Sequence, residues 1–108
     1  MAKYLFINSR DTYEYAKSEN LFDLAEQLKK RGNEVTLFLV ENGVLAARSG
    51  SVGAKRLGAL KQQGLRVLAE DVSLKARGIE RPADGIVVSN MDELADLIVS
   101  GSDKVMWY

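Results

Sequence analysis

The sequence predicts a single-domain α/β protein, a three-layer α/β/α sandwich built on a mostly parallel five-stranded sheet. Short apolar runs alternate with amphipathic stretches along the 108 residues, as is typical of strands joined by right-handed helical crossovers. The run 35–40 is almost entirely apolar, which favours a strand covered on both faces. The chain has one proline and no low-complexity tract, so we expect residues 1–108 to form one domain.

The N-terminal half is predicted to contain two buried strands, over residues 4–7 and 35–40, separated by a helix. Apolar residues recur between these strands at helical spacing, at Leu21, Phe22, Leu24, Ala25 and Leu28. Ser18 is the candidate N-cap of this helix, and Gly32 is a typical residue for its end. A short helix over 43–48 and a flexible loop over 49–53 are expected to follow.

In the C-terminal half, a helix is expected from Ala54 to just before Gly64. The third strand should cover 67–69, and one or two helical turns should follow over 73–77. A fourth strand over 86–88 precedes Asn90 and Glu93, which form a capping-box-like pair before the last helix. The fifth strand covers 105–108, and its large side chains predict an end packed in the core or against another subunit.

The composition excludes several kinds of chemistry, because the chain has neither cysteine nor histidine. It therefore lacks a thiol nucleophile, an imidazole acid or base, and the best ligands for zinc, haem and iron–sulfur clusters. We expect no metal and no cofactor. Basic and acidic residues number 15 each, so charge gives no reason to expect nucleic acid or an anionic membrane as a partner.

The sequence also bears on where the protein works. No apolar run approaches the roughly 20 residues that a membrane-spanning helix needs. The N-terminus enters a strand-like segment almost at once and lacks the pattern of a signal peptide. We therefore expect a cytoplasmic protein.

Polar residues follow the predicted strands at the point where each strand ends. In an open parallel sheet, ligands bind beyond the carboxyl ends of the strands. Among the polar residues at these strand ends, Arg10 would hold an anion, and the carboxylates would hold a cation or a polar ligand. A competing interpretation is that the Asp, Asn and Ser residues only cap helices and form turns. The candidate ligand-binding residues are Asn8, Arg10, Glu41, Asn42, Glu70, Asp71 and Ser73.

Three segments carry a resemblance to a known family. Residues 64–79 read GLRVLAEDVSLKARGI, residues 32–40 read GNEVTLFLV and are followed by Asn42–Val44, and residues 103–108 read DKVMWY. Together they resemble the DsrE/DsrF-like proteins, in the same order and spacing over the whole chain. The resemblance implies a small α/β/α domain that assembles into trimers or hexamers, sometimes with paralogous subunits. It also implies a link to sulfur relay, in which members carry sulfur as a cysteine persulfide.

Under this resemblance, Glu70 takes the place of the reactive cysteine, and Ser73 takes that of a second cysteine found in some members. A persulfide needs a thiolate sulfur, which neither a carboxylate nor a hydroxyl supplies. The chain is therefore expected to be a non-catalytic DsrE-like protein. Its role would be that of an oligomeric binding or assembly subunit associated with sulfur metabolism.

Two other functions stay open at this point. The chain could be a small enzyme that uses Glu70 or Asp71 as a general base, which predicts a carboxylate with a raised pKa. It could instead be a structural subunit of a hetero-oligomeric sulfur-relay complex, which predicts an exposed apolar patch and poor behaviour when the chain is purified alone.

Overall fold

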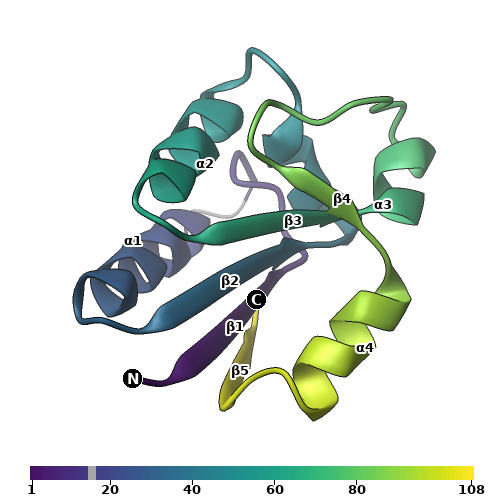
Figure 1. Cartoon of the computed structure of the whole chain (residues 1–108). Helices are drawn as coiled ribbons and strands as arrows, with labels where there is room; N and C mark the ends of the chain where they lie inside the picture. Colours follow the sequence, from purple (N-terminus) through teal and green to yellow (C-terminus); the bar gives the residue numbers. More distant parts are fainter. Residues whose placement is uncertain (15–16) are drawn as a thin grey trace.

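The computed structural model describes residues 1–14 and 17–108, and in them the strands form one sheet in the order β4-β3-β2-β1-β5 (Figure 1). The strands are β1 (Lys3–Asn8), β2 (Glu34–Leu39), β3 (Arg66–Glu70), β4 (Val87–Ser89) and β5 (Lys104–Trp107). Each neighbouring pair is parallel. The predicted five-stranded sheet is confirmed, and its described pairs are all parallel rather than mostly so.

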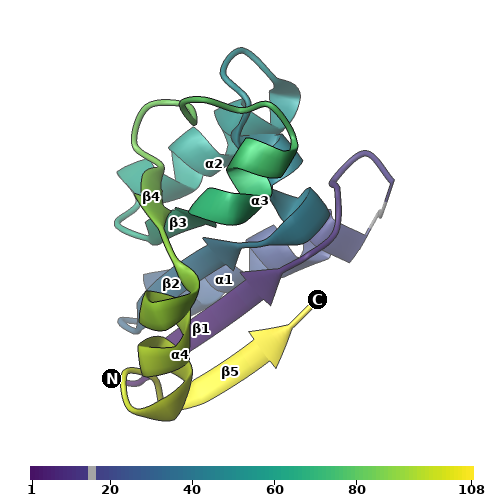
Figure 2. The same cartoon turned by 90° about the vertical axis from the view of Figure 1, so that its right-hand side faces the viewer.

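Helices cover both faces of the sheet. They are α1 (Lys17–Lys30), the 3-10 helix η1 (Glu41–Ala47), α2 (Val52–Gln62), α3 (Asp71–Ala76) and α4 (Met91–Val99). Figure 2 shows α1 and α2 on one side of the sheet and α4 on the other. The three-layer α/β/α sandwich is therefore confirmed. No helix in the described part of the chain is long and apolar enough to cross a membrane.

The two faces of the sheet bury unequal cores. The larger core joins β1, β2 and β3 to α1 and α2, with Phe6, Phe22 and Leu37 fully buried in it. The smaller core lies under α4 and is built around Leu5, Ile7, Phe38 and Leu94. One nine-residue helix thus covers the second face, which leaves the flanks of that face less protected.

Most helix ends follow the predicted signals. Gly32, Gly64 and Gly78 have φ values of 89°, 99° and 69°, the left-handed conformation that ends a helix and favours glycine. Asn90 caps α4, because its Oδ1 accepts from the backbone N–H of Glu93 at 2.9 Å. The capping box is only half formed, since the Glu93 carboxylate accepts from the hydroxyl of Ser89 instead.

Several local predictions were wrong. Ser18 lies inside α1 rather than before it, and its buried hydroxyl has no hydrogen-bond partner among the described residues. Helix α2 begins at Val52, two residues before the predicted start, because the Ser51 hydroxyl accepts from the N–H of Ala54 at 3.0 Å. This cap converts part of the expected loop into the first turn of a helix.

The short helix predicted over 43–48 is the 3-10 helix η1, and it starts two residues earlier, at Glu41. The last strand, predicted over 105–108, is β5, and Met106 and Tyr108 pack against the larger core. The exposed fractions are 40% for Val105 and 62% for Trp107, while Met106 and Tyr108 are half-buried. The large apolar side chains at this end thus divide between the core and the surface.

A charged network ties α1 to α2. The guanidinium of Arg56 donates to Glu19 at 3.0 Å, to Asp23 at 2.8 Å and to Glu26 at 3.0 Å. Gln63 donates to the other carboxylate oxygen of Glu26 at 2.7 Å. The hydrogen bond from Gln63 and then that from Arg56 lower the pKa of the Glu26 carboxyl. The network therefore depends on Glu26 being ionised.

Candidate functional site

The carboxyl edge of the sheet begins with a close approach between β1 and η1. The carbonyl oxygen of Asn8 accepts from the backbone N–H of Val40 at 3.0 Å. A Cβ added to Gly43 would lie 2.0 Å from that same oxygen, a distance that no side chain tolerates. A glycine at this position lets η1 lie directly against the end of β1.

Asn8 supports this turn with its side chain as well. The residue is fully buried, and its Oδ1 accepts from the backbone N–H of Arg10 at 3.2 Å. The Asn8 Nδ2 group is buried without a hydrogen-bond partner among the described residues. The side-chain oxygen of this predicted ligand-binding residue thus accepts a hydrogen bond from the local backbone.

Glu70 is the end of β3 and the N-cap of α3, and it is only 3% exposed. Its Oε2 accepts from the N–H of Val72 at 2.9 Å, and its Oε1 accepts from the N–H of Ser73 at 3.0 Å. The Ser73 hydroxyl also donates to Oε1. Both carboxylate oxygens therefore satisfy N–H and O–H donors in the first turn of α3.

Ser73 connects this cap to the neighbouring strand end. Its buried hydroxyl accepts from the backbone N–H of Glu41 at 2.9 Å. Glu41 is the first residue of η1 and has a φ of 51°, the left-handed conformation that non-glycine residues rarely adopt. The hydrogen bond to Ser73 helps to hold this strained residue in place.

Arg77 completes the cluster, although it was not among the predicted site residues. Its Nε donates to Oδ1 of Asn42 at 3.0 Å, and its Nη1 donates to the carbonyl oxygen of Ser73 at 3.2 Å. Its Nη2 lies 3.5 Å from Oε2 of Glu41. One signal was available in the sequence: Arg77 follows Ser73 by four residues, so the two share a helix face.

The structure thus joins four of the seven predicted residues, Glu41, Asn42, Glu70 and Ser73, into one network that Arg77 completes. Asn8 is the last residue of β1, and Arg10 lies exposed in the turn that follows. Asp71 is also exposed, and its Oδ1 accepts from the N–H of Val72 at 2.8 Å. Within the described residues, no group of acidic side chains could hold a metal ion.

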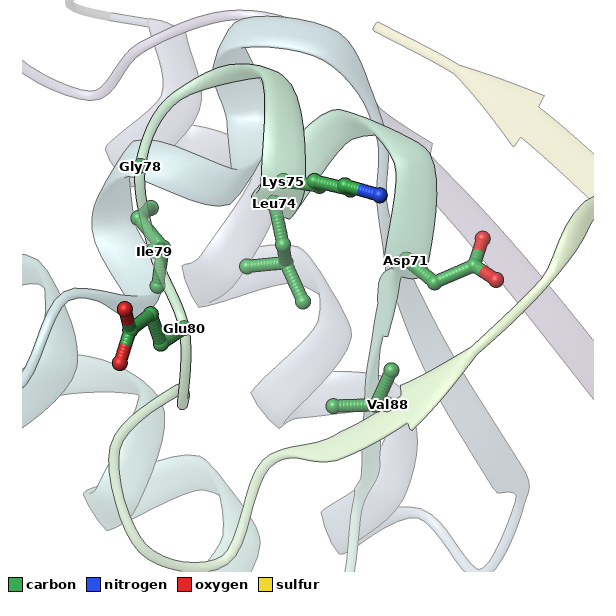
Figure 3. A pocket seen from close by; sticks show the side chains of 7 residues that line it. All are labelled: Asp71, Leu74, Lys75, Gly78, Ile79, Glu80 and Val88. Atoms are coloured by element: carbon green, nitrogen blue, oxygen red, sulfur yellow. The ribbon is translucent and has the colours of Figure 1, made fainter.

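A cavity of about 540 Å³ lies beside α3, between this helix and β4 (Figure 3). Leu74, Ile79 and Val88 give it an apolar lining, and Asp71, Lys75 and Glu80 add charged groups. Asp71 is the predicted site residue that lines it. The residues of the buried network around Glu70 do not line this cavity.

Comparison with solved structures places this fold among known proteins. The YchN protein from E. coli is 24% identical, with a TM-score of 0.91 and full coverage of both chains. The protein MTH1491 from Methanobacterium thermoautotrophicum is 18% identical, with a TM-score of 0.83 and coverage of 98% of this chain and 99% of that one. BT1422 from Bacteroides thetaiotaomicron is 18% identical, with a TM-score of 0.82 and coverage of 99% and 95%. These likenesses show the fold.

No curated protein sequence matches the chain. The model of the DsrE/DsrF-like family matches residues 2–108, which is nearly the whole chain and agrees with the resemblance seen in its three segments. The chain therefore belongs to the DsrE/DsrF-like family.

Proposed function

We propose that the protein is a non-catalytic, cytoplasmic member of its family, an oligomeric binding or assembly subunit associated with sulfur metabolism. The observation that carries this proposal is the state of Glu70. At the position that the resemblance gives to the reactive cysteine, a buried carboxylate caps α3 with both of its oxygens. The chain has no cysteine and so cannot hold a persulfide.

The same geometry disfavours Glu70 as a general base. A catalytic base must reach a proton of the substrate, but Glu70 is 3% exposed and its oxygens face the N–H groups of Val72 and Ser73. Asp71 is exposed, and one of its oxygens accepts from the N–H of Val72. Glu70 thus has neither oxygen free for a substrate, whereas Asp71 is exposed at the wall of the cavity beside α3.

The assembly role is supported by apolar side chains that flank α4. In neighbouring parallel strands, paired residues point to the same face of the sheet. Val105 and Trp107 pair with Leu5 and Ile7, and Val87 pairs with Leu68, so all three point to the α4 side. Their exposed fractions are 40%, 62% and 58%. Val87 lies on one edge strand of the sheet, and Val105 and Trp107 lie on the other. We call these two patches together the flanking surface.

Exposed apolar side chains that continue a core face are typical of a surface that a protein partner covers. We propose that further copies of the chain cover the flanking surface in a closed trimer or hexamer, the states that the family resemblance implies. A paralogous subunit is the other partner that this surface favours, and it would make the chain a structural subunit of a hetero-oligomer.

Native mass spectrometry of protein purified gently from its source, followed by denaturing mass measurement on the same sample, tests this function. A closed homo-oligomer supports the assembly role, and an added mass that denaturation releases supports a binding role as well. A stable complex with a second protein supports the hetero-oligomer. A monomer that carries no added mass would contradict the proposal.

A further inference from the structure

A second cavity, of about 500 Å³, lies at the C-terminal end of α3 and shares Gly78, Ile79 and Glu80 with the first. Three arginines line it, Arg48, Arg77 and Arg81, together with Ser49 and the segment 78–80. Glu80 is the acidic residue in this lining, and Arg77 lies 3.5 Å from the Glu41 carboxylate, so Arg48 and Arg81 supply the excess positive charge. The whole chain, in contrast, has a net charge of zero. The cavity therefore concentrates positive charge.

Backbone contacts fix the segments that carry these arginines. Arg48 forms an isolated antiparallel bridge with Pro82, the neighbour of Arg81. The N–H of Ala83 donates to the carbonyl oxygen of Ala47 at 2.8 Å. The end of η1 and the loop before β4 are thus joined, although they lie more than thirty residues apart in the sequence. The fold therefore holds the backbone at Arg48 beside the backbone next to Arg81.

Arg77 is the anchored member of the set. Its hydrogen bonds to Asn42 and to the carbonyl oxygen of Ser73 fix the guanidinium, whose side chain is 23% exposed. A guanidinium held in this way is oriented before any ligand arrives, which lowers the entropy cost of binding.

Arg48 and Arg81 are exposed, and neither has an ion-pair partner among the described residues. The Nε of Arg48 makes a long contact, 3.4 Å, with the carbonyl oxygen of Leu45. This differs from Arg56, which contacts three carboxylates. Two uncompensated guanidinium groups beside an oriented third one leave positive charge that an anion would neutralise.

The floor of the cavity leaves room for such an anion. Gly78 has a φ of 69°, and a Cβ added there would meet nothing within 4 Å. The cavity is shallow and open to solvent, so a bound oxyanion could belong to a larger molecule that extends beyond it. A tetrahedral phosphate or sulfate group is the anion whose oxygens best match several guanidinium forks.

We propose that this cavity binds a small molecule through a phosphate- or sulfate-type group held by Arg48, Arg77 and Arg81. The group is either a free inorganic ion or the charged end of a small organic molecule. This site is separate from the flanking surface and does not depend on the assembly role.

Isothermal titration calorimetry of the protein as purified tests the site with three probes: inorganic phosphate, sulfate and phenyl phosphate, each at constant ionic strength. Arg81→Met is the test variant, and Arg31→Met is the control, since Arg31 is also an exposed arginine but lies just after α1. Circular dichroism checks that both variants are folded. We expect saturable binding of at least one probe, a roughly tenfold weaker affinity for Arg81→Met, and an unchanged affinity for Arg31→Met.

The probes also separate the two sources of the group. Tighter binding of phenyl phosphate than of inorganic phosphate indicates an organic ligand, and equal or weaker binding indicates the free ion. Two results would overturn the proposal: no saturable binding of any probe, or the same affinity in Arg81→Met as in Arg31→Met and the unchanged protein.

Discussion

The hydroxyl of Ser73 donates a hydrogen bond to the buried carboxylate of Glu70, and it accepts one from the backbone N–H of Glu41 at 2.9 Å. Under the family resemblance, Glu70 takes the place of the reactive cysteine and Ser73 that of a second cysteine. Instead of presenting a nucleophile, they join the end of β3, the first turn of α3 and the start of η1. The position that would carry sulfur is thus part of the structure of the sheet edge.

Ser73→Ala should destabilise the protein by about 1–3 kcal/mol, because the buried Glu70 carboxylate and the Glu41 N–H each lose a partner. Urea unfolding measures the change. Ser49→Ala is the matched control, since Ser49 is exposed, and it should change stability by less than about 0.5 kcal/mol. Equal effects of the two variants would show that the Ser73 hydrogen bonds contribute nothing to stability.

Glu70→Gln and Asp71→Asn compare two adjacent carboxylates with different surroundings. Glu70→Gln should cost about 1–3 kcal/mol, because an amide cannot accept all the donors that both carboxylate oxygens accept. Asp71→Asn should cost less than about 1 kcal/mol, because Asp71 is exposed. Thermal unfolding of both variants measures this. A larger loss in Asp71→Asn would be incompatible with Glu70 as the main cap of α3.

Gly43→Ala should destabilise the protein by more than about 2 kcal/mol, since its Cβ would lie 2.0 Å from the carbonyl oxygen of Asn8. Gly58→Ala is the control within α2, where a Cβ meets nothing within 4 Å. It should stabilise the helix by up to about 1 kcal/mol. Opposite signs in chemical unfolding are expected, and a neutral Gly43→Ala would mean that η1 does not lie against β1.

Acid should weaken the link between α1 and α2. The pKa of Glu26 is lowered in the folded protein, first by Gln63 and then by Arg56. Its contribution to stability is therefore fully present above the unfolded-state pKa, near 4.5, and is lost as the pH falls through the folded value. Stability measured between pH 6 and pH 3, at roughly unit steps, should fall less steeply in Glu26→Gln. Identical slopes would contradict this role of Glu26.

Most of the fold could be predicted because its signals are local. The apolar run 35–40 and the glycines at 32, 64 and 78 specify a strand and three helix ends, and the structure contains all of them. Ser18 was misplaced because the start of a helix depends on which of several polar residues the backbone uses. The exposure of Trp107 could not be predicted either, because a single sequence does not show that α4 is the one described helix that covers this face of the sheet.

The sequence predicted which residues lie at the sheet edge, but not the hydrogen bonds between them. Residues after β2 and β3 were expected to meet because parallel strands end at the same edge, and Glu41, Asn42, Glu70 and Ser73 do form one network. Arg77 was missed because it lies at the end of a helix rather than after a strand. Whether this network binds a ligand stays a prediction.

Sedimentation equilibrium of three proteins tests the central claim, that the chain works as an assembled subunit through its α4 side. They are the unchanged protein, Trp107→Lys on the flanking surface, and Val52→Lys. Val52 is also an exposed apolar residue, at 72% against 62% for Trp107, but it lies on α2, on the opposite side of the sheet. We expect a closed oligomer for the unchanged protein and for Val52→Lys, and a smaller species for Trp107→Lys. A monomeric unchanged protein, or an oligomer that only Val52→Lys disrupts, would contradict the account.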